Sequence, residues 1–181
     1  MAANEYTITI DRREKKPLRF PEHLVVAAPG QNPSKKQAQT VRLRTELRTI
    51  ETADYRLDDH PTNCYAVDAE RTGYVAIETK RSLHEIAGNT LTDKRRATLG
   101  RCLDRMAELP GTALVVFEQP NSELRLTEPE RAVAYDTFLR MLLERGLPWL
   151  SISSNSLRQR ERTAELVARF LIQGARTNAR R

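Results

Sequence analysis

Residues 74–86 read Tyr-Val-Ala-Ile-Glu-Thr-Lys-Arg-Ser-Leu-His-Glu-Ile, a short apolar run that ends in an acid, one spacer and a lysine. The run from Tyr74 to Ile77 is partly β-branched and is typical of a buried strand. Side chains alternate along a strand, so Glu78 and Lys80 are expected to leave its end on the same face. A carboxylate that holds a divalent cation and a lysine that activates water suit phosphodiester hydrolysis. A surface ion pair is the ordinary alternative for Glu-x-Lys.

The totals describe an ordinary globular chain. Its 181 residues are 39% hydrophobic and 30% charged, which suits one domain. Residues 1–16 contain no apolar segment of the kind found in a secretory signal, and no apolar run in the sequence reaches transmembrane length. Cys64 and Cys102 have no metal-ligand spacing and are interpreted as small buried residues. We therefore expect a soluble, reduced, intracellular protein, cytoplasmic or associated with the nucleoid, without a membrane partner.

The charge is basic and unevenly distributed. The formal net charge is +6 and the pI is near 9.6. Residues 157–181 hold seven arginines against two glutamates, and residues 79–105 hold seven Lys or Arg against three acids. Basic patches of this kind fit a polyanionic partner, with nucleic acid as the first candidate. A solubilising face explains the charge equally well, so charge alone does not decide between the two.

Other strands are predicted from period-two or continuously apolar runs. They are expected at Tyr6–Ile10, Val41–Arg48, Asp54–Leu57, Ala113–Phe117 and Trp149–Ser153, and Tyr65–Val67 is a further short candidate. Val41–Arg48 is expected to be half-buried with one basic face. Pro29–Gln39 is rich in polar residues and is expected to form a loop.

Helical spacing begins after Lys80. Ser82 and Glu85 predict a capping box that opens a short helix, which Gly88-Asn89 would close. Thr92 is expected to cap a second helix with an apolar stripe made of Leu99, Leu103 and Met106.

Two further helices are expected toward the C-terminus. Thr127 and Glu130 predict a capping box for a helix that runs to Gly146, with core candidates Ala132, Val133, Phe138, Leu139, Leu142 and Leu143. Ser156 with Gln159 is expected to cap a last helix with core candidates Leu166, Val167 and Phe170. A basic tail would fray after Gly174. This order of elements predicts an α/β fold with a mixed central sheet flanked by helices.

Acids stand at three predicted strand ends: Asp11, Asp54 and Glu78. Clustered carboxylates repel one another, so proteins bring them together mainly where a cation is bound. The order of an upstream Asp followed by Glu-x-Lys at a strand end resembles the restriction-endonuclease-like superfamily. Within it, Ile8–Glu14 resembles the Val-Asp-x-Arg-Glu opening of the XPF-type structure-specific nucleases. Residues 52–57 resemble that family's Gly-Asp-Tyr strand, and residues 77–80 occupy the place of its Glu-Arg-Lys signature.

The resemblance implies a set of site residues. As metal ligands for Mg²⁺ or Mn²⁺ it implies Asp54 and Glu78, with the Thr79 carbonyl as a third. Lys80 would orient or activate water, and Asp11 and Glu14 would be auxiliary acids. Candidate phosphate contacts are Arg13, which could also bind the active-site carboxylates, and Arg81, Arg95, Arg96, Arg101 and Arg105. The ordinary alternatives are an exposed turn pair for Arg13 and Glu14, a turn acid before a strand for Asp54, and a solvated face for the arginines of the second helix.

Several positions depart from the family's pattern. Thr79 replaces the signature arginine, and the signature's final Asp falls on His84, with Glu85 one residue later. His84 is a metal-ligand or general-base candidate or a half-buried bystander, and Glu85 is favoured as the capping partner of Ser82. Glu118, at the end of a predicted central strand, is a weaker ligand candidate. Ala53 stands where the family has glycine.

The resemblance covers residues 6–118, the expected nuclease core within a single domain of residues 1–181. Residues 127–173 would add a strand and helices, and residues 174–181 a basic tail. No tandem helix-hairpin-helix segment is recognisable after Glu118.

The function that these features predict is metal-dependent endonuclease activity on branched or flapped DNA, or on DNA with a single-strand/double-strand junction. A homodimer or a partner subunit would supply further DNA binding. Two alternatives remain: an inactive nuclease fold that binds DNA or acts as a scaffold, and a basic protein-interaction domain.

Overall fold

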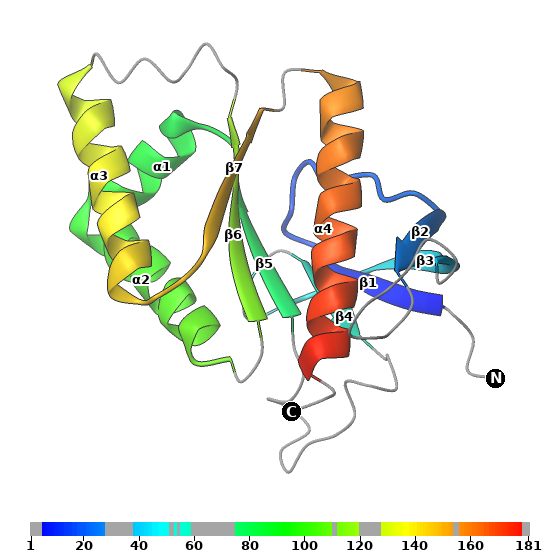
Figure 1. The fold of residues 1–181 in the computed structure, drawn as a ribbon. Coiled ribbons are helices and arrows are strands. Elements are labelled where there is room, and N and C mark those ends of the chain that lie inside the picture. The colour runs from blue at the N-terminus through cyan, green and yellow to red at the C-terminus, as the bar shows by residue number, and fades with distance from the viewer. Residues whose placement is uncertain are drawn as a thin grey trace.

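Seven strands in the described part of the chain form one mixed sheet, and different helices cover its two faces (Figure 1). The computed structural model describes residues 5–27, 38–50, 53, 55–58, 75–109, 112–119, 128–153 and 156–178. The strands are β1 (Glu5–Asp11), β2 (His23–Ala27), β3 (Ala38–Arg48), β4 (Tyr55–Asp58), β5 (Val75–Lys80), β6 (Thr112–Gln119) and β7 (Trp149–Ser153). The helices are α1 (Leu83–Thr90), α2 (Asp93–Ala107), α3 (Pro129–Glu144) and α4 (Leu157–Asn178). None of the helices in these ranges is long and apolar enough to span a membrane.

The strand order is β2-β3-β1-β4-β5-β6-β7. Strand β4 pairs antiparallel with β1 and β5, and β2 pairs antiparallel with β3. The other neighbours are parallel. Parallel pairing of β5, β6 and β7 follows from helical crossovers, because α1 and α2 connect β5 to β6 and α3 connects β6 to β7. The predicted α/β fold with a mixed central sheet flanked by helices is confirmed.

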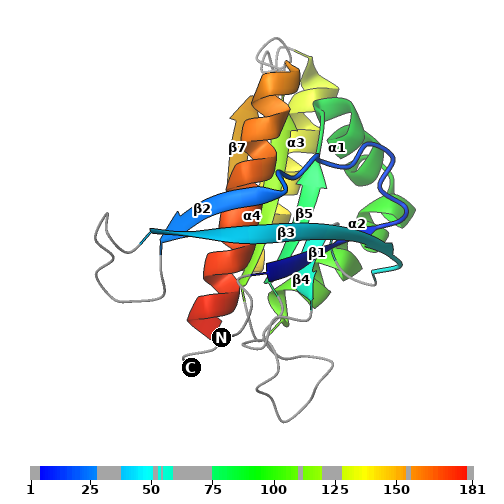
Figure 2. The same cartoon turned by 90° about the vertical axis from the view of Figure 1, so that its right-hand side faces the viewer.

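Strand β5 separates two hydrophobic cores. Ile77 packs into the core that includes the buried side chains of α4, whereas Ala76 packs into the core of α1, α2 and α3. Figures 1 and 2 show α4 on one side of β5 and β6 and the other three helices on the opposite side. Because side chains alternate, Glu78 and Lys80 leave β5 on the face of Ala76. The fold thus directs the Glu-x-Lys motif toward α1 and α2.

Two strand expectations need correction or fall outside the described residues. Strand β2 was not expected from the sequence, because its alternation of exposed and buried residues extends over only five positions. Leu24 and Val26 form its buried face, and β3 is its antiparallel partner. The candidate strand Tyr65–Val67 lies outside the described ranges. So do residues 29–37 of the predicted loop, whose last two residues belong to β3.

The buried stripes of two helices differ from the expectation. Val133 and Leu143 on α3 were core candidates but are 58% and 73% exposed, and Ala134 and Met141 are buried in their place. Leu166 on α4 is also exposed. Each helix packs against the sheet with the side-chain stripe that fits the available space. An apolar residue next to that stripe remains exposed to solvent.

Some helix ends also differ. Helix α3 has Glu128 as its N-cap, without a side-chain cap bond, so the predicted box with Thr127 is wrong; Pro129 at the first helical position starts the helix. Helix α1 passes the expected stop and ends at Thr90. The predicted cap of α4 is confirmed, since Gln159 N donates to Ser156 Oγ at 3.2 Å.

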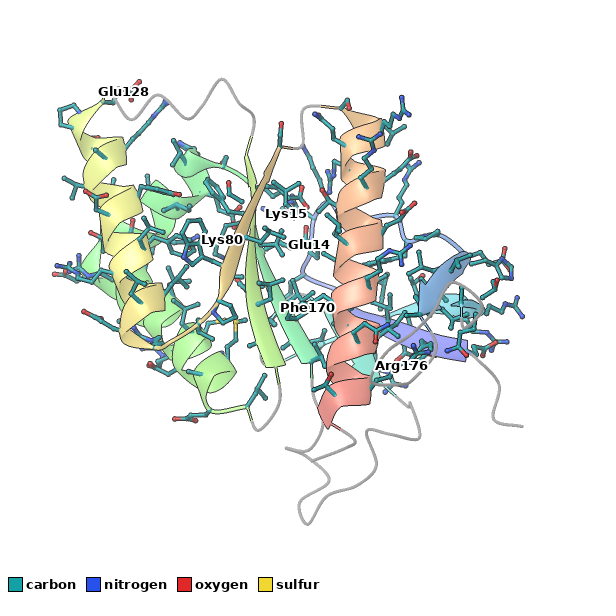
Figure 3. All side chains as sticks on the ribbon, in the orientation of Figure 1. Glu14, Lys15, Lys80, Glu128, Phe170 and Arg176 are labelled. Carbon is teal, nitrogen blue, oxygen red and sulfur yellow. The ribbon has the colours of Figure 1, made fainter. Side chains whose placement is uncertain are left out.

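Gly174 does not end α4, contrary to the expected fraying there. The helix continues to Asn178, because Gly174 allows α4 to approach β5 closely: a Cβ atom at this position would lie 2.8 Å and 2.9 Å from the two γ-carbons of Val75. Arg176, labelled in Figure 3, is buried beyond it. Its Nε donates to Tyr6 Oη at 2.9 Å and its Nη1 to Ala27 O at 2.6 Å. This part of the expected basic tail is therefore structural.

We expect Gly174→Ala to lower the free energy of unfolding by about 1–2 kcal/mol, because overpacking against Val75 outweighs the roughly 1 kcal/mol gain in helix propensity. Gly100→Ala on α2 is the matched control, since its Cβ would meet its nearest atoms at 3.6 Å and 3.7 Å. We expect the control to be more stable than the wild type. Urea unfolding of both variants tests this, and a stabilised Gly174→Ala variant would contradict the close approach.

Candidate functional site

Glu78 and Lys80 form a buried ion pair at the carboxyl end of β5. Lys80 Nζ bonds Glu78 Oε1, and the two residues are only 6% and 7% exposed. Nζ also lies 3.6 Å from Glu85 Oε1 on α1. The alternation of the strand accounts for the pairing, and the predicted side-by-side placement is confirmed. Burial distinguishes this pair from the surface ion pair that was the ordinary alternative.

The N-terminus of α1 adds a second acid beside the pair. Ser82 is the N-cap, and its Oγ accepts from Glu85 N at 3.1 Å, as predicted. The carboxylate of Glu85 accepts from Arg81 N at 2.9 Å, one residue earlier than a complete capping box requires. The Glu85 carboxylate therefore contacts both the backbone before α1 and the Lys80 ammonium group. His84 is exposed on α1 and does not line the pocket described next.

A cavity of about 560 Å³ opens at this edge of the sheet. Residues at the end of β1, the end of β5 and the facing sides of α1 and α2 form its walls. Figure 3 labels Glu14, Lys15 and Lys80 in this region. Among the predicted site residues, those that line the cavity are Asp11, Arg13, Glu14, Glu78, Thr79, Arg81 and Arg105. The sequence motifs of residues 11–14 and 78–81 thus converge on one cavity.

Asp11 is buried and bound by Arg13. Asp11 Oδ1 accepts from Arg13 N at 2.9 Å and from Arg13 Nε at 3.0 Å, and Oδ2 bonds Arg13 Nη2. The same guanidinium bonds the Ile50 carbonyl. Burial by itself would raise the pKa of Asp11, but the hydrogen bonds and the charge of Arg13 outweigh it and lower that pKa. Arg13 thus binds the Asp11 carboxylate at the cavity. Contact with an active-site carboxylate is one of the two roles that the resemblance implies, and it stays a prediction.

The lowered pKa of Asp11 predicts an acid dependence of stability. A carboxylate with a depressed folded-state pKa stabilises the protein above its unfolded pKa of about 3.9, and this stabilisation is lost as the pH falls through the folded-state pKa. We expect Asp11→Asn to lower the free energy of unfolding by about 1–2 kcal/mol at pH 7 and to differ little from the wild type near pH 2. Urea unfolding between pH 2 and 7 measures this, with Asp93→Asn on the surface as the control. A difference that is independent of pH would contradict the assignment.

Cys102 lies against the second oxygen of Glu78. Its Sγ is 3.8 Å from Glu78 Oε2. Burial, followed by the charge of Glu78, raises the pKa of the thiol to about 11, so the thiol is protonated at neutral pH. The sequence predicted a small buried residue at position 102, whereas Cys102 is only partly buried. The sequence carried no signal for the contact with Glu78, because α2 meets β5 only in the folded chain. Lys15 and Thr98 also line the cavity and were not expected there.

Two arginines, Arg81 and Arg160, bind the segment that follows β1. Arg81 pairs with Glu14, and its Nη2 donates to Lys16 O at 3.2 Å. Arg160 on α4 donates from Nη2 to the same carbonyl at 2.8 Å, and its Nε lies 3.7 Å from Glu118 Oε2. Sequence reasoning missed Arg160, because the two contacting residues are 144 positions apart.

Glu118 lies on the opposite face of the sheet from Glu78. Val115 is the register partner of Glu78 and belongs to the core of α1–α3, whereas Val116 belongs to the core of α4. Alternation places Glu118 on the face of Val116. It is 2% exposed, and burial raises its pKa despite the opposing charges of Arg160 and Arg81. Glu118 does not line the cavity and is the partner of Arg160.

The four arginines of α2 differ in what they contact. Arg105 lines the cavity. Arg95 and Arg96 donate to the carbonyls of Gly88 and Thr90 at 3.2 Å and 3.3 Å, in the last turn of α1, and Arg96 also pairs with Asp93. Arg101 is exposed and donates to Thr98 Oγ1 at 3.1 Å. Of these four, Arg105 is therefore the one that borders the cavity.

The donor atoms at the cavity fit a hard divalent cation in part. Glu78 provides a carboxylate, and carboxylate oxygens suit Mg²⁺ or Mn²⁺. Its Oε2 contacts the Cys102 thiol weakly, at 3.8 Å. Within the described ranges, no three His, Cys, Asp or Glu side chains form a group that could hold a metal ion. Asp54, the other expected carboxylate ligand, lies outside those ranges. Its role and that of the Thr79 carbonyl stay predictions.

Ala53 has a backbone conformation that favours glycine. It is buried on the cavity wall with a φ of 69°, in the left-handed region that favours glycine. The next described residue, Tyr55, pairs with Ile77 of β5.

Two solved structures resemble this fold. Over 92% of this chain, XPF from Aeropyrum pernix superposes with a TM-score of 0.51 and 17% sequence identity. The same protein in complex with DNA superposes over 93% of this chain, with a TM-score of 0.50 and 15% identity. The chain spans 64% and 66% of the length of those chains. No protein-family model matches, and no curated protein matches. The resemblance inferred from the motifs is confirmed at the level of the fold, which this chain shares with XPF.

Proposed function

We propose that this chain is a metal-dependent endonuclease that hydrolyses phosphodiester bonds in branched or flapped DNA. The observation that carries the proposal is Glu78, which is paired with the buried Lys80 and lines a cavity together with Asp11, Arg13 and Arg105. A carboxylate paired with an ammonium group, together with two guanidinium groups at the same cavity, suits phosphodiester hydrolysis. The fold shared with XPF, a protein also solved in complex with DNA, adds support.

In this proposal Glu78 and Asp54, with the Thr79 carbonyl, hold Mg²⁺ or Mn²⁺. The bound ion would polarise the scissile phosphate and lower the pKa of the attacking water. Lys80 keeps Glu78 Oε1 in place, which leaves Oε2 for the ion, and its ammonium group orients the water. Arg105 and Arg13 at the cavity attract the phosphate. Arg13 also keeps Asp11 ionised, so the cavity retains an auxiliary acid.

Glu14 and Arg81 have a positioning role in this proposal. Their ion pair connects the segment after β1 to the start of α1. Arg13 lies next to Glu14 in that segment, so the pair keeps Arg13 at the cavity. A homodimer or a partner subunit that adds DNA-binding surface stays a prediction of the resemblance.

A second candidate function is a DNA-binding scaffold that has lost catalysis. The observation in its favour is that Lys80 Nζ is bound between two carboxylates, those of Glu78 and Glu85, where an active lysine needs access to water. His84, at the place of the signature's last acid, is exposed and away from the cavity.

Incubation with labelled flap, fork and linear duplex DNA in Mg²⁺, Mn²⁺ or EDTA separates the two candidates. We expect cutting of the flap and fork with either metal, little cutting of the linear duplex, and none in EDTA. Tight binding of branched DNA without cutting in any metal would favour the scaffold.

A further inference from the structure

The segment after β1 and the first turns of α4 are joined at one backbone carbonyl. Lys16 O accepts from Arg81 Nη2 at 3.2 Å and from Arg160 Nη2 at 2.8 Å. Arg160 is also held by Glu118, whose carboxylate is buried. The guanidinium of Arg160 therefore links the two segments through these contacts. Figure 2 shows the connection from β1 to β2 passing the end of β5 and approaching α4.

This junction brings together two basic tracts that are far apart in sequence. The first, residues 12–19, contains five Lys or Arg and one acid, Glu14, which Arg81 neutralises. The second, residues 157–162, contains three arginines and one acid, Glu161. The exposed cations beside the junction are Lys15, Lys16, Arg158 and Arg162. We name these four side chains the basic track.

The basic track differs from the arginines of β3 in its lack of acidic partners. None of its four side chains forms an ion pair with another described residue. On β3, by contrast, Arg42, Arg44 and Arg48 pair with Glu22, Glu5 and Glu46. On α3, Arg131 pairs with Glu128. Uncompensated cations at one place favour a polyanion as partner.

The track begins at the proposed active site. Lys15 lines the cavity with Arg13 and Glu78, and its neighbour Lys16 is joined to α4 through its carbonyl. On α4, Arg158 and Arg162 are one turn apart on the same side of the helix, about 6 Å along its axis. Cations that lead away from a site for a phosphodiester suit a chain of phosphates, which carries one charge per about 3.4 Å of axis on each strand.

We propose that the basic track binds the phosphodiester backbone of the DNA strand that leaves the cavity, from Lys15 and Lys16 to Arg158 and Arg162. This inference rests on the proposed function, because the strand enters the track from the active site. The contacts are electrostatic and independent of base sequence. A DNA-binding surface on α4 would contribute part of the DNA affinity that a separate DNA-binding domain would otherwise provide.

The test is equilibrium binding of fluorescently labelled single-stranded DNA and flap DNA in EDTA, at several salt concentrations. The variant is Arg158→Ala with Arg162→Ala. The matched control is Arg131→Ala with Arg140→Ala on α3, which removes the same charge on the opposite face of the sheet. Each phosphate contact contributes about 0.7 to the slope of log affinity against log salt for a single strand.

We expect the α4 variant to reduce this slope by about 1.4 and to weaken binding at least tenfold near 100 mM salt, while the control keeps the wild-type slope. All four substituted side chains are at least partly exposed, and urea unfolding verifies that both variants remain folded. An α4 variant with the slope and affinity of the wild type would overturn the proposed track.

Cleavage separates this inference from the proposed function. If the wild type cuts flap DNA and the α4 variant binds like the wild type, the track is wrong and the nuclease stands. If the wild type never cuts but loses its salt slope on substitution of Arg158 and Arg162, the track stands and the nuclease proposal fails. If the wild type binds neither DNA at low salt, both fail.

Discussion

Replacement of Lys80 with methionine is expected to lower the free energy of unfolding by about 3–5 kcal/mol, because it leaves the buried Glu78 carboxylate without its partner. Both side chains are at most 10% exposed, so the few water molecules that reach Glu78 from the cavity are a poor substitute for the missing ammonium group. Methionine keeps most of the volume of lysine, so the loss reports on charge and not on packing. Urea unfolding at pH 7 gives the value.

The double variant Glu78→Gln, Lys80→Met is expected to recover most of that loss, since a neutral amide costs far less to bury than an ion. Arg145→Met is the control: its ion pair with Asp104, whose side chain is 50% exposed, is expected to contribute less than about 1 kcal/mol. A Lys80→Met variant as stable as the wild type would mean that the end of β5 is open to solvent.

The second large effect is expected on catalysis. Glu78→Gln removes the charge of the one described carboxylate that the proposal assigns to the metal, and should slow single-turnover cleavage of flap DNA by about 10³-fold, which corresponds to several kcal/mol of transition-state stabilisation. DNA binding in EDTA should remain, because the basic residues that contact phosphates are unchanged.

The matched control for this prediction is Glu108→Gln at the exposed end of α2. It makes the same chemical change outside the cavity and should cut at the wild-type rate. If Glu78→Gln cuts as fast as the control, Glu78 has no part in the chemistry and the cavity is not the active site.

Local patterns predicted the elements that carry their own signal. The apolar run before Glu78 and the run at residues 113–117 became β5 and β6, and alternation alone was sufficient to place Glu78 beside Lys80. Ser82 and Ser156 identified two helix starts, because a cap depends on residues only three positions apart. These features arise within one turn or one strand and need no tertiary contact.

Contacts between distant segments were beyond the sequence. Gly174 resembles a helix terminator, yet its function is to let α4 pack against Val75. Arg160 belongs by composition to a basic surface segment, yet its guanidinium fastens the Lys16 carbonyl beside the cavity. In each case the deciding neighbour lies more than 90 positions away, and no periodic pattern relates the two.

The candidate site shows the same division. Motif order brought Asp11, Glu14 and Glu78 to one cavity, as expected from the resemblance. The arginines of α2 could not be sorted from spacing alone. Arg95 and Arg96 contact the last turn of α1, whereas Arg105, two to three turns later, borders the cavity. Which face of a helix meets a neighbour depends on packing that a single helix does not encode.

The most direct test of the central claim is a single-turnover cleavage assay of labelled flap DNA with excess protein, in Mg²⁺, Mn²⁺ or EDTA, for the wild type and Glu78→Gln. We expect the wild type to cut in either metal and not in EDTA, and Glu78→Gln to lose the cutting while it still binds the DNA. Metal-independent cutting, or equal cutting by the two proteins, would contradict a metal-dependent active site at the carboxyl end of β5.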